Sequence, residues 1–408
     1  MVYFFNLYDI IFFKGGFTLR VFCERLDDYG RGIVFLDKIC FVPGLLPLEE
    51  ADIEIVLNKK KYMIGKVISI ISESPYRVSS LCPYDSCGCA LKNLAYDKTL
   101  EFKLNKVRSI LSKFASLDNV VSSIVESDNV NFYRNKVTLK VNHGVGYFKN
   151  NSNDFLGISS CFIAKKVIND IIDVLNMLDL SGVHEITIKA YDEVMIVIDG
   201  VLDFSVLKDY ASSIYMNGNL VYGKRYVLAS ISSFRFYVGP EAFFQINDNM
   251  TLKLYEKVSS YLSGDTVLDL FCGTGTISLF LSKYFSKVIG VEINEDAVSC
   301  ANMNKELNHV SNVSFICGDV SDILPSLKAS SLVVDPPRAG LSKEAVLSIL
   351  KIGPDRIVYV SCDPVTLARD LSLLKEDYEV LDVTLFDMFP NTYHVECVSV
   401  LHRKSLEK

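Results

Sequence analysis

The sequence predicts an α/β protein: a C-terminal doubly wound, Rossmann-like domain, preceded by a central α+β domain and a small N-terminal β-barrel. From about residue 250 onward, apolar strand-like runs alternate with helical stretches, the pattern of a mainly parallel sheet. Residues 15–75 instead hold short runs of β-branched and aromatic residues broken by glycine and proline. The 408 residues suffice for two to four domains. We therefore expect domains over residues 1–75, 76–240 and 241–408.

Composition narrows the class of protein. Half of the residues are hydrophobic and mean hydropathy is +0.25, yet no stretch reaches about 18 uncharged apolar residues. We therefore expect no membrane contact and a cytoplasmic protein, acting as a monomer. The net charge of −7 argues weakly against a nucleic-acid partner. Residues 1–150 are nevertheless net basic, so the front of the chain is the better place for a polyanion such as RNA.

The first two predicted domains contain few residues that indicate a particular chemistry. A five-stranded barrel over residues 1–75 is an architecture on which oligonucleotides dock, and a β module that only packs on its neighbour is equally compatible. In the central domain, residues 98–114 and 161–178 show helical periodicity, and residues 137–148 and 193–200 read as strands. Three cysteines crowd together there, at Cys82, Cys87 and Cys89, which indicates a metal or cluster site.

The C-terminal domain opens with a glycine loop. A strand runs into Gly273-x-Gly275 and then into a helix, where glycine lets the backbone approach a ligand closely. Glu292 closes the next strand, at the place of a ribose-binding carboxylate. Asp269 precedes the loop, and Ser278 replaces the third glycine of the dinucleotide fingerprint, which favours S-adenosylmethionine over NAD. A glycine turn that serves only packing is the alternative.

Three further motifs follow at strand ends. Asp335 and two prolines form a rigid turn after a buried strand, or merely end it. Cys362 stands at the tip of the next strand before a proline-led helix, whose positive end should lower the thiol pKa and make it a nucleophile; a buried small residue is the alternative. Glu396 lies in an apolar strand, where a carboxylate needs a function or a partner. His394 could be that partner.

Together these segments resemble a known family. DLFCGTGT, DPPRAG, YVSCDPVTLARDL and DMFPNTYHVE look like successive motifs of the RNA (uracil-5-)-methyltransferases. AFFQIN is similar to the Phe-x-Gln-x-Asn signature of that family, FYRNKVTL to its Tyr-Arg-Asn-Lys stretch, and the opening segment to its TRAM domain. The resemblance covers nearly the whole chain.

The resemblance implies methyl transfer from S-adenosylmethionine to C5 of a uridine in RNA. Cys362 would add to C6 of uracil and Glu396 would remove the C5 proton. The residues implied for the cofactor pocket are Gln245, Phe271, Gly273, Gly275, Thr276, Glu292, Asp319 and Asp335. Asp363 departs from the asparagine usual after the catalytic cysteine, and its charge could raise the thiol pKa.

The resemblance also bears on the cysteines. TRAM-containing members often hold a [4Fe–4S] cluster through three spaced cysteines and a distant fourth. Here the ligands would be Cys82, Cys87, Cys89 and Cys161, with each gap one residue shorter than in the family. Zinc or free thiols are the alternatives. The cluster and the TRAM domain favour 23S ribosomal RNA over transfer RNA as substrate, by analogy.

Two rival functions remain at this point. One is a class I methyltransferase acting on an exocyclic amine or a protein. That chemistry needs no covalent nucleophile, so the pair of Cys362 and Glu396 argues against it. The other is an RNA-binding module without catalysis, which the intact pair and the glycine loop disfavour.

Overall fold

The computed structural model describes residues 10–13, 16–85, 88–150 and 152–405. The chain forms two compact units. The first, here called the N-terminal unit, comprises Met1–Phe102, Phe148–Leu156 and Asn391–Tyr393, and the second, the main unit, comprises the rest. The division into three domains remains a prediction.

The N-terminal unit contains a seven-stranded sheet in the order β1-β2-β6-β7-β5-β4-β3. Register shifts between β6 and β7 mark bulges, which bend long strands and let a sheet curl. The apolar side chains inside the curl include Cys23, Val34, Val42 and Ile53. The sheet is thus a curled half-barrel. Its strands are β1 (Ile10–Phe13), β2 (Gly16–Phe22), β3 (Arg25–Leu26), β4 (Gly32–Phe35), β5 (Ile39–Val42), β6 (Glu50–Asn58) and β7 (Tyr62–Ser72).

A second seven-stranded sheet has the order β11-β10-β9-β12-β13-β14-β15. Helix α2 (Lys166–Leu175) buries an apolar stripe with helical spacing, Ile168, Ile171, Ile172 and Leu175. The strands are β9 (Lys136–Val141), β10 (Val145–Phe148), β11 (Phe155–Gly157), β12 (Val183–Ala190), β13 (Val194–Gly200), β14 (Ser213–Met216) and β15 (Asn219–Gly223). A short helix η1 (Ser205–Asp209) and a hairpin of β16 (Val227–Ile231) and β17 (Phe234–Val238) complete this region.

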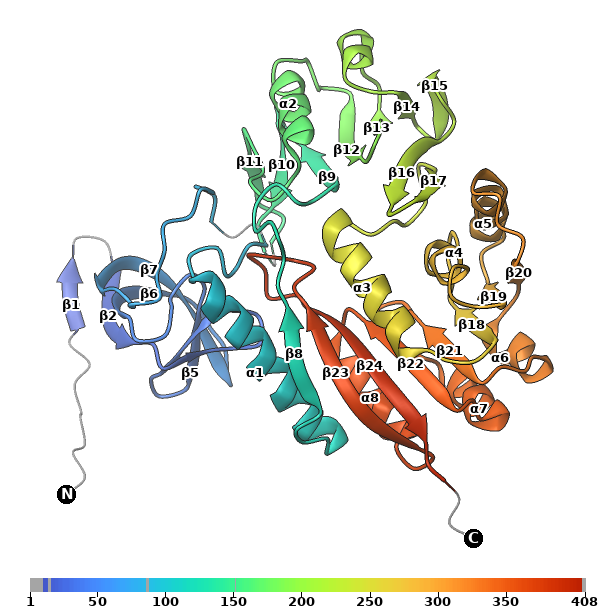
Figure 1. Cartoon of the computed structure of the whole chain (residues 1–408). Helices are drawn as coiled ribbons and strands as arrows, with labels where there is room; N and C mark the ends of the chain where they lie inside the picture. Colours follow the sequence, from blue (N-terminus) through green and yellow to red (C-terminus); the bar gives the residue numbers. More distant parts are fainter. Residues whose placement is uncertain (1–9, 14–15, 86–87, 151, 406–408) are drawn as a thin grey trace. The chain divides into compact units, whose positions relative to one another are not determined.

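The main sheet has eight strands in the order β20-β19-β18-β21-β22-β24-β23-β8, which are labelled in the lower half of Figure 1. All run parallel except β24, which pairs antiparallel with both neighbours. Its strands are β8 (Val121–Val125), β18 (Thr266–Leu270), β19 (Lys287–Glu292), β20 (Val313–Cys317), β21 (Ser331–Val334), β22 (Arg356–Ser361), β23 (Tyr378–Phe386) and β24 (Glu396–Arg403).

Helices cover both faces of this sheet, because its central strands are apolar on both sides. The further helices are α1 (Tyr96–Ala115), α3 (Asp248–Tyr261), α4 (Thr276–Leu281), α5 (Glu295–Leu307), α6 (Val320–Ile323), η2 (Leu324–Ser326), α7 (Lys343–Ile352) and α8 (Pro364–Leu374). In β18, Leu268 packs in a cluster with α7 and α8, whereas Val267 packs in another with α3 and α4.

This architecture confirms the predicted α/β fold class. Parallel strands place their carboxyl ends along one edge of the sheet, where doubly wound proteins bind ligands. Because β24 runs antiparallel, its first residue, Glu396, comes to this same edge. The predicted motifs after β18, β19, β21 and β22 therefore meet at one edge. Among the described residues, no helix is both long enough and apolar enough to cross a membrane.

Candidate active site

The glycine loop leaves β18 through a strained turn. Phe271 has a φ of 64°, a conformation that costs energy for an aromatic residue, and its N–H donates to the Val291 carbonyl at 2.9 Å. Gly275, with φ 81°, precedes the first residue of α4, and a Cβ there would lie 2.6 Å from the ring of Phe315. Only glycine fits at this position. The backbone is thus shaped for close approach, as the sequence indicates.

Glu292, the last residue of β19, fixes the loop. One carboxylate oxygen accepts from the Gly273 N–H at 3.1 Å and the other from the Asn294 N–H at 2.9 Å. The predicted ribose ligand therefore lies beside the glycine loop, as predicted for a doubly wound nucleotide site. Its carboxylate has a second task, because it also holds the backbone of the loop.

Two buried polar pairs support the start of α4. Asp269 accepts a hydrogen bond from the Ser278 hydroxyl at 2.5 Å, and its other carboxyl oxygen has no hydrogen-bond partner among the described residues. Burial raises the pKa of Asp269 to about 7. The hydroxyls of Thr276 and Tyr255 lie 2.8 Å apart. Ser278 replaces the third glycine of the dinucleotide fingerprint, and its hydroxyl is the donor to Asp269.

Gln245 lies in the segment between β17 and α3. Its carbonyl accepts from the Asn135 side chain at 2.9 Å, and the same amide group donates to Asp248 at 2.6 Å. The Asn135 N–H also donates to the Ile246 carbonyl at 3.0 Å. The Tyr-Arg-Asn-Lys stretch therefore holds the Phe-x-Gln-x-Asn segment in place. Nothing in the linear sequence relates these two motifs, which are about a hundred residues apart.

Asp319 occupies a different environment from the other predicted cofactor residues. It is exposed and caps α6, where its carboxylate accepts from the Ser321 N–H at 2.8 Å and from the Ser321 hydroxyl. Helix capping is the role of Asp319 that is visible in the structure.

Strand pairing brings Cys362 and Glu396 together. In the antiparallel ladder of β22 and β24, Ser361 lies opposite Cys397. One step further along the same register, Cys362 comes opposite Glu396. The two predicted catalytic residues thus meet at the end of the ladder, although they come from different motifs.

Charged side chains near Cys362 and Glu396 shift the pKa values of both residues. Burial, and the carboxyls of Glu396 and Asp335, raise the pKa of the Cys362 thiol to about 11, whereas Arg338 lowers it. Burial raises the pKa of Glu396 well above its usual value. The Asp335 carboxyl raises this pKa further, and Arg338 lowers it. Burial also raises the pKa of Asp335 to about 7. Four side chains from three strand ends therefore form one electrostatic group. Arg338 is not among the residues predicted for the site, although it follows the two prolines directly.

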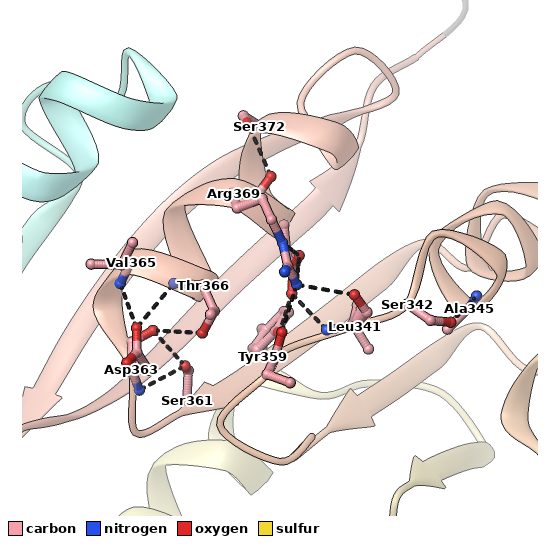
Figure 2. A network of polar contacts seen from close by, with 12 residues as sticks. Leu341, Ser342, Ala345, Tyr359, Ser361, Asp363, Val365, Thr366, Arg369 and Ser372 are labelled. Atoms are coloured by element: carbon pink, nitrogen blue, oxygen red, sulfur yellow. Dashed lines mark hydrogen bonds and ion pairs between the residues drawn. The ribbon is translucent and has the colours of Figure 1, made fainter.

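The prediction that the α8 dipole lowers the pKa of Cys362 is wrong. The N-terminus of α8 is already occupied by Asp363, whose carboxylate accepts from the N–H groups of Val365 at 2.9 Å and Thr366 at 3.0 Å (Figure 2). A capping carboxylate offsets the positive end of the helix. Asp363 thus has a local structural role that an asparagine could fill equally.

Helix α8 is also tied to the turn that contains Asp335. The fully buried Asp370 accepts from the Leu341 N–H at 2.8 Å and from the Tyr359 hydroxyl at 2.6 Å. Arg369 donates to the carbonyls of Ala339 at 2.9 Å and Leu341 at 3.0 Å. The Thr366 hydroxyl also donates to the Arg338 carbonyl at 3.2 Å, so the end of the Asp335–Arg338 turn is fixed against the helix that follows Cys362.

His394 is not the charge partner of Glu396 that the sequence allowed. Burial and four cationic side chains lower its pKa to about 4, so the imidazole is neutral at physiological pH. These cations are Arg338, Lys106, Lys103 and Arg134. The surroundings of His394 are therefore electropositive, which suits an anionic substrate.

The predicted metal ligands are only partly described. Cys82 and Cys89 are half-buried in a loop that Lys92 closes by donating to the carbonyls of Cys82 at 3.0 Å and Tyr84 at 2.7 Å. Cys87 lies outside the described residues, and Cys161 belongs to the main unit. Within the described parts of the chain, no three His, Cys, Asp or Glu side chains gather as a metal site requires. The four thiols fit a cluster by their chemistry alone, so that site remains a prediction.

Comparison with known proteins identifies relatives that are named as RNA methyltransferases. The family described as tRNA (uracil-5-)-methyltransferase matches residues 220–323 and 318–404. An uncharacterized RNA methyltransferase of Clostridium tetani is 33% identical, over 95% of this chain and 97% of that protein. A similar protein of Oceanobacillus iheyensis is 32% identical over 93% and 95%. The crystal structure of the Pyrococcus abyssi tRNA (uracil-54, C5)-methyltransferase with S-adenosyl-L-homocysteine superposes with a TM-score of 0.79 and 27% identity, over 94% of this chain and 100% of that one.

Proposed function

The chain belongs to the S-adenosylmethionine-dependent RNA (uracil-5-)-methyltransferases, and from this premise we propose that Cys362 and Glu396 carry the reaction through a covalent adduct with uracil. The observation that supports the proposal best is the register of β22 and β24, which places a thiol opposite a buried carboxyl group. Methylation of an amine would need no such nucleophile.

The chemistry assigns one bond change to each residue. The Cys362 sulfur gives up its proton to solvent and adds to C6 of uracil, so that C5 becomes nucleophilic. S-adenosylmethionine would supply the electrophilic methyl group: its sulfonium–methyl bond would break as the bond from C5 to that carbon forms, with S-adenosylhomocysteine as the leaving group. Glu396 then takes the C5 proton, the C5–C6 double bond returns and the Cys362 thiolate leaves. Because burial raises the pKa of Glu396, its ionised form is a stronger base than an exposed carboxylate.

The proposed cofactor residues are those that the family resemblance implies. We propose that Glu292 binds the ribose, that Gly273, Gly275, Phe271 and Thr276 form the floor of the pocket, and that Asp335 and Gln245 face the methionine part. Asp319 is the most peripheral of the set, because its carboxylate caps α6.

The proposed substrate is RNA bound along the electropositive surroundings of His394, two residues before Glu396. Lys106 and Arg134 are partly exposed and Arg338 is exposed, so phosphates can approach their charges. We propose 23S ribosomal RNA as the target, on the strength of the N-terminal half-barrel and the cysteine loop. Transfer RNA is an equal second candidate, because the Pyrococcus abyssi relative acts on uracil 54 of tRNA.

A mechanism-based cross-link tests the covalent step. With RNA that carries 5-fluorouridine at the target, C5 has no proton to lose, so protein and RNA should remain joined. Cys362→Ala should give no adduct, whereas Cys317→Ala, a change of an exposed cysteine, should leave it intact. An adduct that survives Cys362→Ala would contradict the assignment. Glu396→Gln, which cannot accept the proton, should accumulate the same joined species on unmodified RNA.

Mapping 5-methyluridine separates the two RNA targets. In RNA from cells with and without the gene, loss of the mark from 23S ribosomal RNA alone supports the first candidate. Loss from transfer RNA alone supports the second. Loss from neither would contradict both.

We also propose that Cys82, Cys87, Cys89 and Cys161 hold one [4Fe–4S] cluster with a structural role. Thiolates are the ligands that such clusters use, and zinc could take the same four. Anaerobically purified protein should contain about four irons per chain. Cys82→Ser should lose them, and Cys23→Ser, at a buried core position, should not. Colourless protein with one zinc per chain, or with no metal, would contradict the cluster.

A further inference from the structure

Residues 387–395 connect β23 to β24 and lead directly into Glu396. We call them the base-carrying segment. They form turns and bends but no helix or strand, so no regular ladder satisfies their backbone polar groups. Buried carbonyls without a donor cost free energy, and the donors supplied by other elements therefore determine the path of this segment.

Four consecutive carbonyls of the segment each accept a hydrogen bond from a different part of the chain. Three donors are side chains of the main unit, and the fourth is a backbone N–H within the N-terminal unit, to which Asn391–Tyr393 belong. The bonds are Asn247 Nδ2 to Met388 O at 3.3 Å, Lys103 Nζ to Phe389 O at 3.0 Å, Tyr133 Oη to Pro390 O at 3.1 Å, and Leu91 N to Asn391 O at 3.0 Å.

Among these donors, Tyr133 can be substituted with the fewest other effects on the structure. Its side chain is 5% exposed, and its hydroxyl can be removed without changing a charge. Lys103 also forms a fully buried ion pair with Asp387, and Asn247 also caps α3, so both have wider structural roles. Tyr133 belongs to the Tyr-Arg-Asn-Lys stretch, and its hydroxyl is not part of the proposed chemistry.

We propose that Tyr133 is a positioning residue for Glu396, acting through the Pro390 carbonyl. The inference deepens the proposed function and rests on it. Pro390 lies six positions before Glu396, at the point where the chain leaves the main unit for Asn391–Tyr393. The Tyr133 hydroxyl thus fixes the base-carrying segment at Pro390, its last residue in the main unit before Asn391.

The step that depends on this placement is removal of the C5 proton. A base that is misplaced by about 1 Å can slow a reaction by about a hundredfold. The residues proposed for cofactor binding and thiol addition lie at or after the ends of β18, β19, β20, β21 and β22, and Gln245 lies before α3, so none of them belongs to the segment. Loss of the Tyr133 hydroxyl should therefore slow the last step and leave the earlier ones unchanged.

Tyr133→Phe is the test, with Tyr378→Phe as its matched control. Tyr378 is 1% exposed and donates to another proline carbonyl, that of Pro354, at 2.9 Å, at the opposite end of β23. Each variant loses one buried bond from a tyrosine to a proline. The measurements are the covalent protein–RNA species at steady state, the rate of product release, the dissociation constant of S-adenosylmethionine and the melting temperature.

For Tyr133→Phe we expect about tenfold slower release and accumulation of the covalent species, with unchanged cofactor affinity. Tyr378→Phe should lower the melting temperature to a similar extent without accumulation. If the covalent species accumulates to the same extent in both variants while the wild-type protein still forms the adduct, the positioning role is overturned and the covalent mechanism stands. Failure of the wild-type protein to form an adduct with 5-fluorouridine RNA would overturn both this inference and the covalent mechanism.

Discussion

Replacing Asp335 with asparagine is expected to stabilise the ligand-free protein while weakening its use of the cofactor. Burial raises the pKa of Asp335 from 3.8 to about 7. Between these pH values the folded protein retains a proton that the unfolded chain has lost, so the free energy of unfolding falls as pH rises. At about 1.36 kcal/mol per pH unit, the shift sets an upper limit of about 4 kcal/mol.

Asparagine removes this penalty because it has nearly the same shape and no charge. The residue as a whole is partly exposed, so we discount the limit and expect a gain of about 1–3 kcal/mol at pH 8. The gain should shrink toward pH 4, where the folded carboxyl is protonated and the unfolded one, with a pKa of 3.8, is close to half protonated. Urea unfolding of the two proteins between pH 4 and 8 measures it. Asp199→Asn, at an exposed position on β13, is the control and should follow the wild type.

The ligand arm of the experiment uses two cofactor forms. S-adenosylmethionine has a positive sulfonium and S-adenosylhomocysteine a neutral thioether, so an ionised Asp335 should favour the first. Calorimetry with Asp335→Asn should show a larger loss of affinity for S-adenosylmethionine than for S-adenosylhomocysteine. A stability difference that does not vary with pH would refute the buried-carboxyl argument, and equal losses for both ligands would refute the placement beside the methyl donor.

Three further outcomes are expected. Alkylation of Cys362 by iodoacetamide, followed by peptide mass spectrometry, should rise about tenfold per pH unit from pH 7 to 10, since its pKa is about 11; a plateau below pH 9 would contradict that environment. Lys103→Met leaves its buried partner carboxylate unpaired and should lower the free energy of unfolding by about 3–5 kcal/mol, whereas Lys98→Met, at a surface pair on the same helix, should lower it far less. Glu292→Ala should weaken S-adenosylmethionine binding by about 1.5–3 kcal/mol in calorimetry, and unchanged affinity would argue against the ribose role.

Local sequence signals predicted the parts of the site that depend on neighbouring residues. The glycine loop, its acidic neighbour Glu292 and the strand ends at Asp335 and Cys362 follow from short-range patterns, because each lies where a strand passes into a turn or helix. The pairing of Cys362 with Glu396 could not be derived in this way. It depends on the register between β22 and an antiparallel β24 that follows only after β23.

The same limit explains why the supporting network was missed. Asn135 and Asp370 look like ordinary polar residues in the sequence, and only the folded chain shows that they hold the Gln245 segment and the Asp335 turn. Burial of such side chains is a tertiary property. Motif resemblance pointed to the right stretches, since both residues lie inside the segments that resemble the family, but it did not assign a physical role to either.

The raised pKa of Cys362 changes how this residue must work if it is the nucleophile that we propose. With a pKa of about 11, the thiol is protonated at neutral pH, so it is not a preformed thiolate at the end of a helix. Asp363 has taken the helix N-terminus, and the groups that remain near the sulfur are two carboxyls and Arg338. Both carboxyls also have raised pKa values, and while they are protonated the closely spaced acids do not repel one another in the ligand-free site. The thiol must therefore lose its proton as substrate and cofactor bind, and Arg338 is the cation already in place to stabilise the resulting charge.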